Sequence, residues 1–578
     1  MVITDLTSDE QRVHDAFADG TPVDLEGGSV RATVLRAMLL AEAPRAGTVP
    51  GLWLSRARVT GCLDLAHGTV AHPVRLLDCE FTERPHLYGA GVRQLDLSGS
   101  RLPGLLAAHL HVEGVLRLSR CHLTGPLRLS SARLAGSLFL DGVRGARVRL
   151  DGAEVHDALI LEDARLASPE PDEAQPDEPP DEVQRGELRR GGSGAGSGSG
   201  AGAAAGTGEP VLSAVNTRIG GGVNAVRLTA HGGVLLTGAR VEGTLNLEHA
   251  HLVPGPGGEA LVAPVLTVSL DLLCNGLRAE GEVRLSRSRV GGRLNLEDAH
   301  LSGPGHTALR LSGMTVGAGV WAPGLRSEGR LTLRDAQVTG PCVLTGSRLS
   351  GTGRPALVAD GAVLGELRLR NAEFVSGGIS LRGATCTTLH LAADAWPDEV
   401  RLDGFTYQAL SPHLPPAVRL GLLAREATGH VPYAYEQLTA AYRRAGDETA
   451  ARTVQLAKHR HHRSTLPRHA RLWGVLQDAT VGYGYRPLRA AGWLLALLAT
   501  GTVVYALHHP APLKPPEAPV FNPLFYTLDL LLPVVGFGQE SAFRPAGPLQ
   551  WLAHTLTVLG WVLATTVLTG ATRTLARP

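Results

Sequence analysis

The sequence predicts a mainly β fold, a parallel β-helix (solenoid) with a helical cap at its N-terminus, followed by an α-helical hairpin and two transmembrane helices. A unit of about 11 residues recurs along most of the chain, which is the signature of a solenoid. The pattern becomes helical after Pro432. Two long uncharged stretches then follow near the C-terminus.

The repeated unit reads Gly-x-Leu-x-Leu-x-x-Ala-x-Leu/Val. Leu127 and Leu129 alternate with Arg128, and this period of two is that of a strand. We expect the glycine to supply unusual dihedral angles and the small residue to occupy an inward corner. Such short strands must stack, and about ten coils would give a rod roughly 50 Å long. Clear copies of the unit begin at Gly114, Gly125, Gly243, Gly292, Gly329 and Gly365.

Composition divides the predicted solenoid into two parts, residues 51–167 and 211–410. The intervening residues 168–210 begin acidic and proline-rich (PEPDEAQPDEPPDE) and end rich in Gly, Ser and Ala. This segment has too little apolar surface to order itself, so we expect a disordered insertion within one solenoid. A true domain linker is the alternative.

Residues 1–50 are predicted to form a helical cap, because an open solenoid end exposes a strand edge. Ser8 is a candidate N-cap, with Gln11 as its capping-box partner. A second helix over 30–41 has one apolar face. That face consists of Val34, Leu35, Met38 and Leu39.

The A-x-L element, as in Ala132-x-Leu134 and Ala164-x-Leu166, is similar to pentapeptide-repeat and related β-helix proteins. Its spacing departs from a clean five-residue repeat and favours a flatter coil than a square one. The whole chain resembles a bacterial family often labelled "membrane-associated oxidoreductase". The resemblance covers the cap, the solenoid, the segment YEQLTAAYRRAGD and the two-span tail, and it implies a redox activity at a membrane.

The region after the solenoid is predicted to be a helical, basic juxtamembrane segment over 411–486. A two-span membrane domain is predicted over 487–578, with spans at 490–507 and 549–571. Flanking arginines then place both termini in the cytoplasm. Buried core helices are the alternative for these apolar stretches. Candidate contacts to lipid headgroups are Lys458, Arg460 and Arg463.

The segment 521–540, between the predicted spans, combines a short apolar run with a glycine-rich loop. The run is too short to span, so it suits a re-entrant or interfacial helix. The order of elements resembles a pore-loop channel subunit. Candidate pore residues are Asp529, Gly536, Phe537 and Gly538; the alternative is an interfacial helix that stabilises the anchor.

Catalytic and cofactor motifs are missing from the sequence. No GxxxxGK[ST], HExxH or GxSxG stands in a credible context, and the six Cys form no CxxC pair. We therefore predict no catalytic, cofactor-binding or metal-binding residues, and we interpret the Cys side chains as small buried groups. The net charge of +1 gives no chain-wide field for nucleic acid.

These observations predict a membrane-anchored cytoplasmic scaffold, with a protein partner on the solenoid face and lipid as a second partner. One alternative is a channel-like or sensor protein of the cell membrane. The other is the oxidoreductase that the resemblance implies.

Overall fold

The computed structural model describes residues 5–41, 50–145, 147–167, 209–351, 355–390, 396–427, 429, 431–465, 487–514, 519–532 and 536–575. It also omits the side chains of 304–306, 463–465, 487–490 and 564–575. The chain divides into two compact units, Met1–His413 and Leu414–Pro578. Each unit is described by itself.

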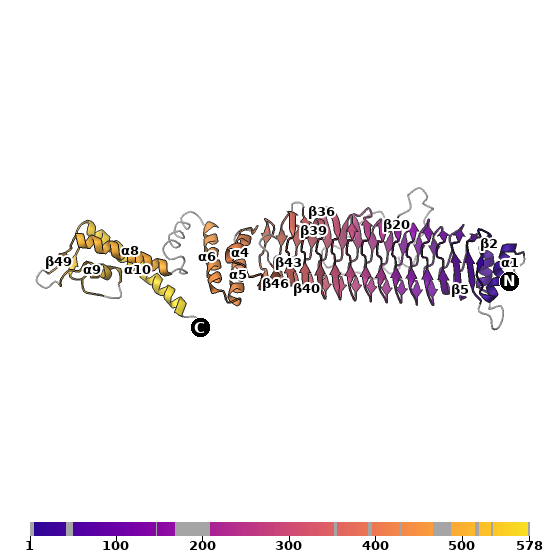
Figure 1. Ribbon diagram of the computed structural model, residues 1–578, viewed down its shortest axis with the longest axis horizontal. Coiled ribbons are helices and arrows are strands. Elements are labelled where there is room, and N and C mark those ends of the chain that lie inside the picture. The colour runs from indigo at the N-terminus through magenta and orange to yellow at the C-terminus, as the bar shows by residue number, and fades with distance from the viewer. Residues whose placement is uncertain are drawn as a thin grey trace, which may run out of the picture. The chain divides into compact units, whose positions relative to one another are not determined.

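The first unit is a parallel β-solenoid of about 14 turns. Its strands form two 24-stranded sheets, which Figure 1 shows as two rows of stacked arrows. Each turn contributes strands to both sheets, so the coil is two-sided, in line with the flatter coil expected from the sequence. At about 4.8 Å per turn the stack is roughly 65 Å long, longer than the ten coils predicted.

One turn illustrates the arrangement. Strands β10 (His111–Val112) and β11 (Leu116–Arg117) belong to the first sheet, here sheet A, and β12 (His122–Leu123) and β13 (Leu127–Arg128) belong to sheet B. Leu116 and Leu118 are fully buried, and Arg117 between them points outward. The alternation therefore fills the interior with leucine and leaves polar residues outside.

Leucines stack on leucines from one turn to the next. In sheet A, Leu116 of β11 pairs with Leu138 of β15 (Leu138–Phe139), which pairs with Leu159 of β19 (Leu159–Ile160). The same register continues across the insertion, since β19 pairs with β23 (Val223–Asn224). The turns before and after residues 168–208, which lie outside the described residues, thus belong to one continuous stack.

Among the six glycines that begin the clear copies of the repeat, Gly329 has a positive φ of 141° as predicted, but the other five have a different role. Gly125, Gly136 and Gly365 lie outside the left-handed region of backbone conformation. A Cβ atom at Gly125 would lie 2.2 Å from the carbonyl oxygen of Pro103, and one at Gly365 would lie 2.2 Å from that of Thr339. Glycine is needed because successive turns approach too closely for a side chain.

Left-handed conformations occur instead at the corners. Arg120, Ser131 and Asp163 have φ values of 56°, 54° and 56°, although none is glycine. The small residue after each corner, such as Cys121 or Ala132, is fully buried. The prediction that the small residue occupies an inward corner is therefore confirmed. The residue with the left-handed φ is the one immediately before it in the sequence.

The N-terminal end is covered as predicted, with a shift of one residue in the cap. Helix α1 (Ser8–Asp19) begins after Thr7, whose side chain and Glu10 form the capping box, so the prediction of Ser8 and Gln11 was wrong. Helix α2 (Ala32–Leu39) buries its apolar face. Strands β1 (Val23–Asp24) and β2 (Ser29–Arg31) pair with β3 (Leu52–Ser55) and β4 (Arg58–Thr60) and so form the first turn.

Glu10 joins the cap to this first turn through an ion pair. Its side chain is 1% exposed and accepts hydrogen bonds from Nε, Nη2 and the backbone N–H of Arg31 at 2.8, 2.6 and 3.0 Å. The Arg31 guanidinium lowers the pKa of Glu10 to about 2. The folded carboxylate thus resists protonation more than the unfolded one.

We expect Glu10→Gln to destabilise the cap by about 2 kcal/mol at neutral pH, because a charge-assisted bidentate contact is lost. In the unaltered protein this stabilisation is complete above the unfolded pKa, near 4.5, and is lost as the pH falls toward 2. The measurement is hydrogen exchange of the α1 amides between pH 2.5 and 7. A variant with the same pH dependence as the unaltered protein would contradict this assignment.

The second unit begins with three helices, α4 (Pro416–Leu423), α5 (Pro432–Arg444) and α6 (Glu448–Thr465). Helices α5 and α6 form the hairpin expected from their apolar faces. Tyr442 is 1% exposed and donates a hydrogen bond to the carbonyl oxygen of Leu414 at 2.7 Å. The other buried residues of the hairpin include Tyr435, Leu438, Ala441, Ala450, Ala451 and Val454.

The C-terminal helices are α8 (Pro487–Leu507), α9 (Pro523–Leu531) and α10 (Pro548–Leu575), and they pack on one another. Tyr505 donates a hydrogen bond to the carbonyl oxygen of Leu549 at 3.1 Å, and its ring meets Tyr526 edge-on at 4.9 Å. Gly560 lies so close to α9 that a Cβ atom would be 2.4 Å from the carbonyl oxygen of Leu531. The core comprises Tyr505, Tyr526, Leu530, Leu531, Phe543, Ala553 and Leu556.

The predicted membrane domain is contradicted. Among the residues that the structure describes, no helix has the length and apolar character that crossing a membrane requires. The spans at 490–507 and 549–571, the cell-membrane localisation and the cytoplasmic placement of both termini were therefore wrong. Part of the apolar sequence that suggested spans forms the core around α9, and polar residues such as Thr500 and His554 interrupt both helices.

Candidate functional site

Asp529, the predicted pore residue, anchors a loop. It lies on α9 and is 6% exposed. Its carboxylate accepts hydrogen bonds from the backbone N–H groups of Phe537, Gln539 (2.7 Å) and Glu540 (3.1 Å). These backbone amides supply the hydrogen bonds that the buried carboxylate needs, and no cation is required. The Asp529 carboxylate therefore links α9 to the loop that follows it.

The other candidate pore residues lie on that loop and face outward. Gly536, Phe537 and Gly538 are exposed, and Gly538 has a φ of 78°. The Phe537 ring packs against Phe525 of α9, with 5.2 Å between the ring centroids. The structure thus brings the four candidates together, but in a loop that is hydrogen-bonded to α9. The pore interpretation required a membrane domain, and without that domain it has no support.

The predicted lipid-contacting residues lie on α6. Lys458 forms an ion pair with Glu436 of α5, so its positive charge is already paired within the α5–α6 hairpin. Arg460 is exposed on the same helix. The side chain of Arg463 lies outside the described residues.

The cysteine thiols are poorly suited to nucleophilic or redox chemistry. All except Cys62 are buried, as predicted. Burial raises the pKa of Cys79 to about 11 and that of Cys121 to about 12. The reactive thiolate is therefore scarce at neutral pH.

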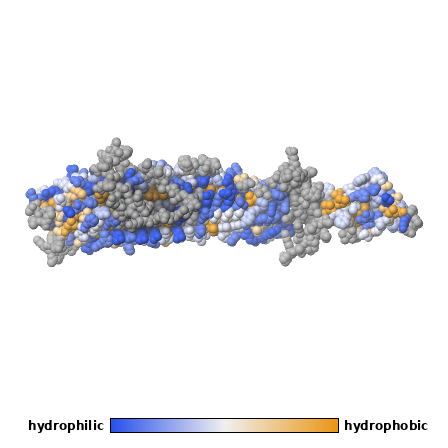
Figure 2. All heavy atoms as spheres, turned by 180° about the vertical axis from the view of Figure 1, so that it is seen from behind, coloured by the Kyte–Doolittle hydropathy of each residue, from blue (hydrophilic) through white to orange (hydrophobic). Residues whose placement is uncertain are grey.

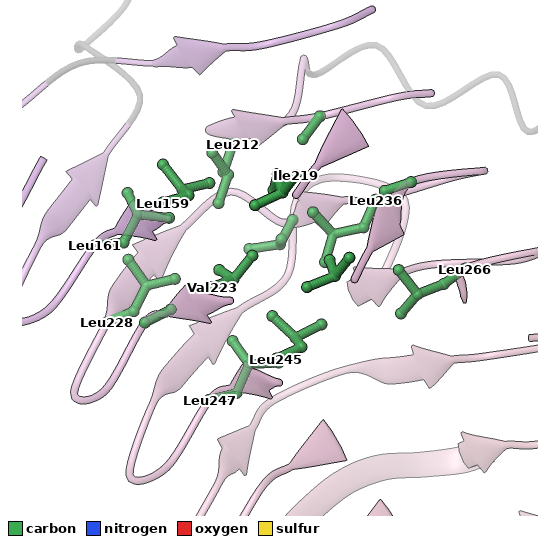
Figure 3. Close-up of a pocket in the computed structure, with 15 residues that line it drawn as sticks. Leu159, Leu161, Leu212, Ile219, Val223, Leu228, Leu236, Leu245, Leu247 and Leu266 are labelled. Carbon is green, nitrogen blue, oxygen red and sulfur yellow. The ribbon is translucent and has the colours of Figure 1, made fainter. Parts of the chain in front are cut away.

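An interior cavity lies between the sheets near the insertion (Figure 3). Its volume is about 30 Å³, and all fifteen residues lining it are apolar. Val223, Leu245 and Ile219 point into it. A space of this size with no polar partner does not suit a substrate or a cofactor.

The cavity predicts a stabilising substitution. Val223 replaces the leucine that its neighbours in the stack, Leu159 and Leu245, both carry. We expect Val223→Leu to stabilise the solenoid by about 0.8 kcal/mol, because the added methylene enters existing space. The midpoint of urea unfolding measures this. Val283→Leu is the matched control, since Val283 is buried away from the cavity and an added methylene there meets packed neighbours. Equal shifts in both variants would contradict the prediction.

The outer surface of sheet B carries a feature that the sequence analysis missed. The first residue of one strand in each turn lies directly above its equivalent in the turn before. At the ten consecutive positions from Arg101 to Arg348 every member except Thr229 is Arg or His, and we call these ten residues the basic ladder. In the same row Glu80 precedes Arg101 and Glu373 follows Arg348. The basic ladder consists of Arg101, His122, Arg144, Arg165, Thr229, His251, Arg278, His300, Arg326 and Arg348.

The basic ladder is exposed along most of its length. Only Thr229 and His251 are half-buried. Figure 2 shows that the visible face of the solenoid is mainly hydrophilic. A detectable signal was present in the sequence, since Arg or His repeatedly stands immediately after the small corner residue, as in Ala132-Arg133 and Ala164-Arg165 on alternate sheets.

Apolar side chains are exposed on α8 and α10, and Figure 2 shows hydrophobic residues on the surface of this helical part. Leu507 is 71% and Trp551 is 76% exposed. Leu495, Val503 and Val558 are also more than half exposed. Such a concentration of apolar side chains at a surface is typical of an interaction site.

Three comparisons with known proteins lend no support to the oxidoreductase resemblance and assign this apolar surface no role. Comparison with protein-family models, with curated protein sequences and with solved structures found no match.

Proposed function

We propose that this protein is a non-catalytic scaffold whose solenoid presents a rigid, polar face to a protein partner. The observation that carries the proposal is the continuous stack of about 14 turns with repeated outward residues in register. Stacked repeats act as extended binding surfaces because each outward position recurs at a fixed spacing.

Three further observations support a binding role over a catalytic one. The described interior cavity is too small and too apolar for a substrate, and the buried thiols have raised pKa values. Asp529, the buried acid that the sequence singled out, has its carboxylate occupied by backbone amides. None of these groups is poised for proton transfer or nucleophilic attack.

Site-specific photocrosslinking of the full chain in its native cell tests the proposal. A photoreactive residue replaces Arg144 on sheet B, Arg240 on sheet A or, as a control, Gln11 on the N-terminal helix. We expect a discrete crosslinked protein from at least one solenoid position and not from Gln11. Absence of discrete products from both sheets, or the same products from all three positions, would contradict the scaffold.

A further inference from the structure

We propose that the basic ladder on sheet B binds an acidic, proline-rich peptide segment of a partner protein in an extended conformation. The inference rests on the proposed function and names the chemistry of the partner. The register, exposure and charge of the ladder support it.

Parallel stacking converts residues distant in sequence into a straight row of cations. Arg101 of β8 (Arg101–Leu102) pairs with His122 of β12, and His122 pairs with Arg144 of β16 (Arg144–Gly145). Arg144 pairs with Arg165 of β20 (Arg165–Ala167). These four residues form the open stretch of the ladder, with neighbours about 4.8 Å apart.

The arginines of the open stretch form no ion pair in the described part of the chain, and the acidic groups beside them are Glu80, next to Arg101 in the row, and Asp163, whose pKa Arg165 helps to lower. No ion pair within 4.0 Å involves Arg101, Arg144 or Arg165. Asp163, two residues from Arg165, is bound to Arg227 at 2.6 Å instead. Elsewhere the ladder is neutralised, for example by Glu280 beside His251 at 3.0 Å. The open stretch is thus where the ladder is most available to an anion.

The sequence offers little for recognition of nucleic acid on this surface. Single strands are usually held by bases stacked on aromatic rings. Between residues 101 and 348 the only Phe, Tyr or Trp residues are Phe139 and Trp321, and both lie in sheet A.

An extended peptide with polyproline II geometry matches the spacing of the ladder. Such a helix has three residues per turn and a rise of about 3.1 Å per residue, so one face recurs every 9.3 Å or so. Two steps of the ladder measure about 9.6 Å. Carboxylates at every third residue would therefore meet alternate rungs, such as Arg101 and Arg144. Proline also lowers the entropy lost when the peptide becomes ordered.

The first-strand row of sheet A provides a matched control within the same fold. Its members occupy the same position in the repeat but include Glu154, which binds Arg218 at 3.1 Å. Arg240 and Arg289 are exposed there and are separated by Thr267. Replacing them removes the same charge from the other side of the coil.

The test is fluorescence anisotropy of the full chain with a labelled (Glu-Pro-Pro)₅ peptide at low ionic strength. We expect binding that weakens with added salt and that is reduced roughly tenfold by Arg101→Ser with Arg144→Ser, which removes two alternate rungs. The control pair Arg240→Ser with Arg289→Ser should change affinity less than twofold. Circular dichroism of each variant verifies that the solenoid remains folded.

Three results would overturn the inference. They are equal binding of a neutral (Gln-Pro-Pro)₅ peptide, equal loss in both variant pairs, and tighter binding of an oligonucleotide of equal charge that the sheet B variant abolishes. Failure here is distinguishable from failure of the scaffold, because crosslinks from Arg240 on sheet A would still identify a partner.

Discussion

Gly340→Ala is expected to destabilise the solenoid by about 4 kcal/mol, an effect at the upper end for a single methyl group. Gly340 lies in β40 (Gln337–Val343), and a Cβ atom there would lie 1.6 Å from the carbonyl oxygen of Ala318 in the turn below. The new Cβ atom and the carbonyl oxygen of Ala318 are both fixed to the backbone, so neither can move aside as a flexible side chain would. The two turns must therefore separate locally and lose stacking and hydrogen bonds on both sides.

The measurement is the midpoint of urea unfolding followed by the β signal in circular dichroism, with Gly257→Ala as the control. A Cβ atom at Gly257 meets nothing within 4 Å, and Gly257 lies outside the left-handed region. We expect the control to unfold within about 0.5 kcal/mol of the unaltered protein. A loss for Gly340→Ala no greater than that of the control would show that the turns are not packed this closely.

The contrast between these glycines shows where prediction from sequence ended. Alternating leucines such as Leu127 and Leu129 gave the strand, and the recurrence gave the solenoid, because both depend on local spacing. The reason for Gly125 or Gly340 was not predictable, since the atoms that exclude a side chain lie one full turn away. The left-handed corners are occupied mostly by glycine and by polar residues such as Asn, Asp, His and Arg, so a residue such as Arg120 gives only a weak signal for this conformation.

The number of turns was underestimated for a related reason. Turns such as those of β3 and β46 (Thr385–His390) lack the full Gly-x-Leu-x-Leu pattern, yet they pair with their neighbours in register. Once a stack exists, its hydrogen bonds and buried side chains impose the same conformation on a divergent unit. A sequence pattern detects the regular turns and misses those that follow by contact.

The basic ladder was missed because each of its cations, taken alone, resembles a solvated surface residue. Arg144 and Arg165 acquire a joint meaning only when parallel pairing places them side by side. The predicted membrane spans erred in the opposite direction. Apolar stretches were judged by length, whereas residues such as Tyr505 and Leu556 are used in packing against α9.

Asp529, which the sequence singled out as a candidate pore residue, is a buried acid, and backbone amides compensate for its burial. We expect Asp529→Asn to destabilise the α8–α10 core by about 3 kcal/mol. The amide keeps one acceptor oxygen, but its NH₂ group faces backbone N–H donors that then have no acceptor. Both the charge assistance and at least one hydrogen bond are lost.

Hydrogen exchange of the amides of Phe537, Gln539 and Glu540 is the direct measurement, because these are the groups that Asp529 binds. Their protection should fall by roughly a hundredfold in Asp529→Asn, which corresponds to about 3 kcal/mol of local opening. Glu540→Gln serves as the control: its side chain is exposed, and its backbone N–H still donates to Asp529. Unchanged protection in Asp529→Asn would mean that the loop is held by the Phe525–Phe537 contact and the Gln539 side chain rather than by the buried carboxylate.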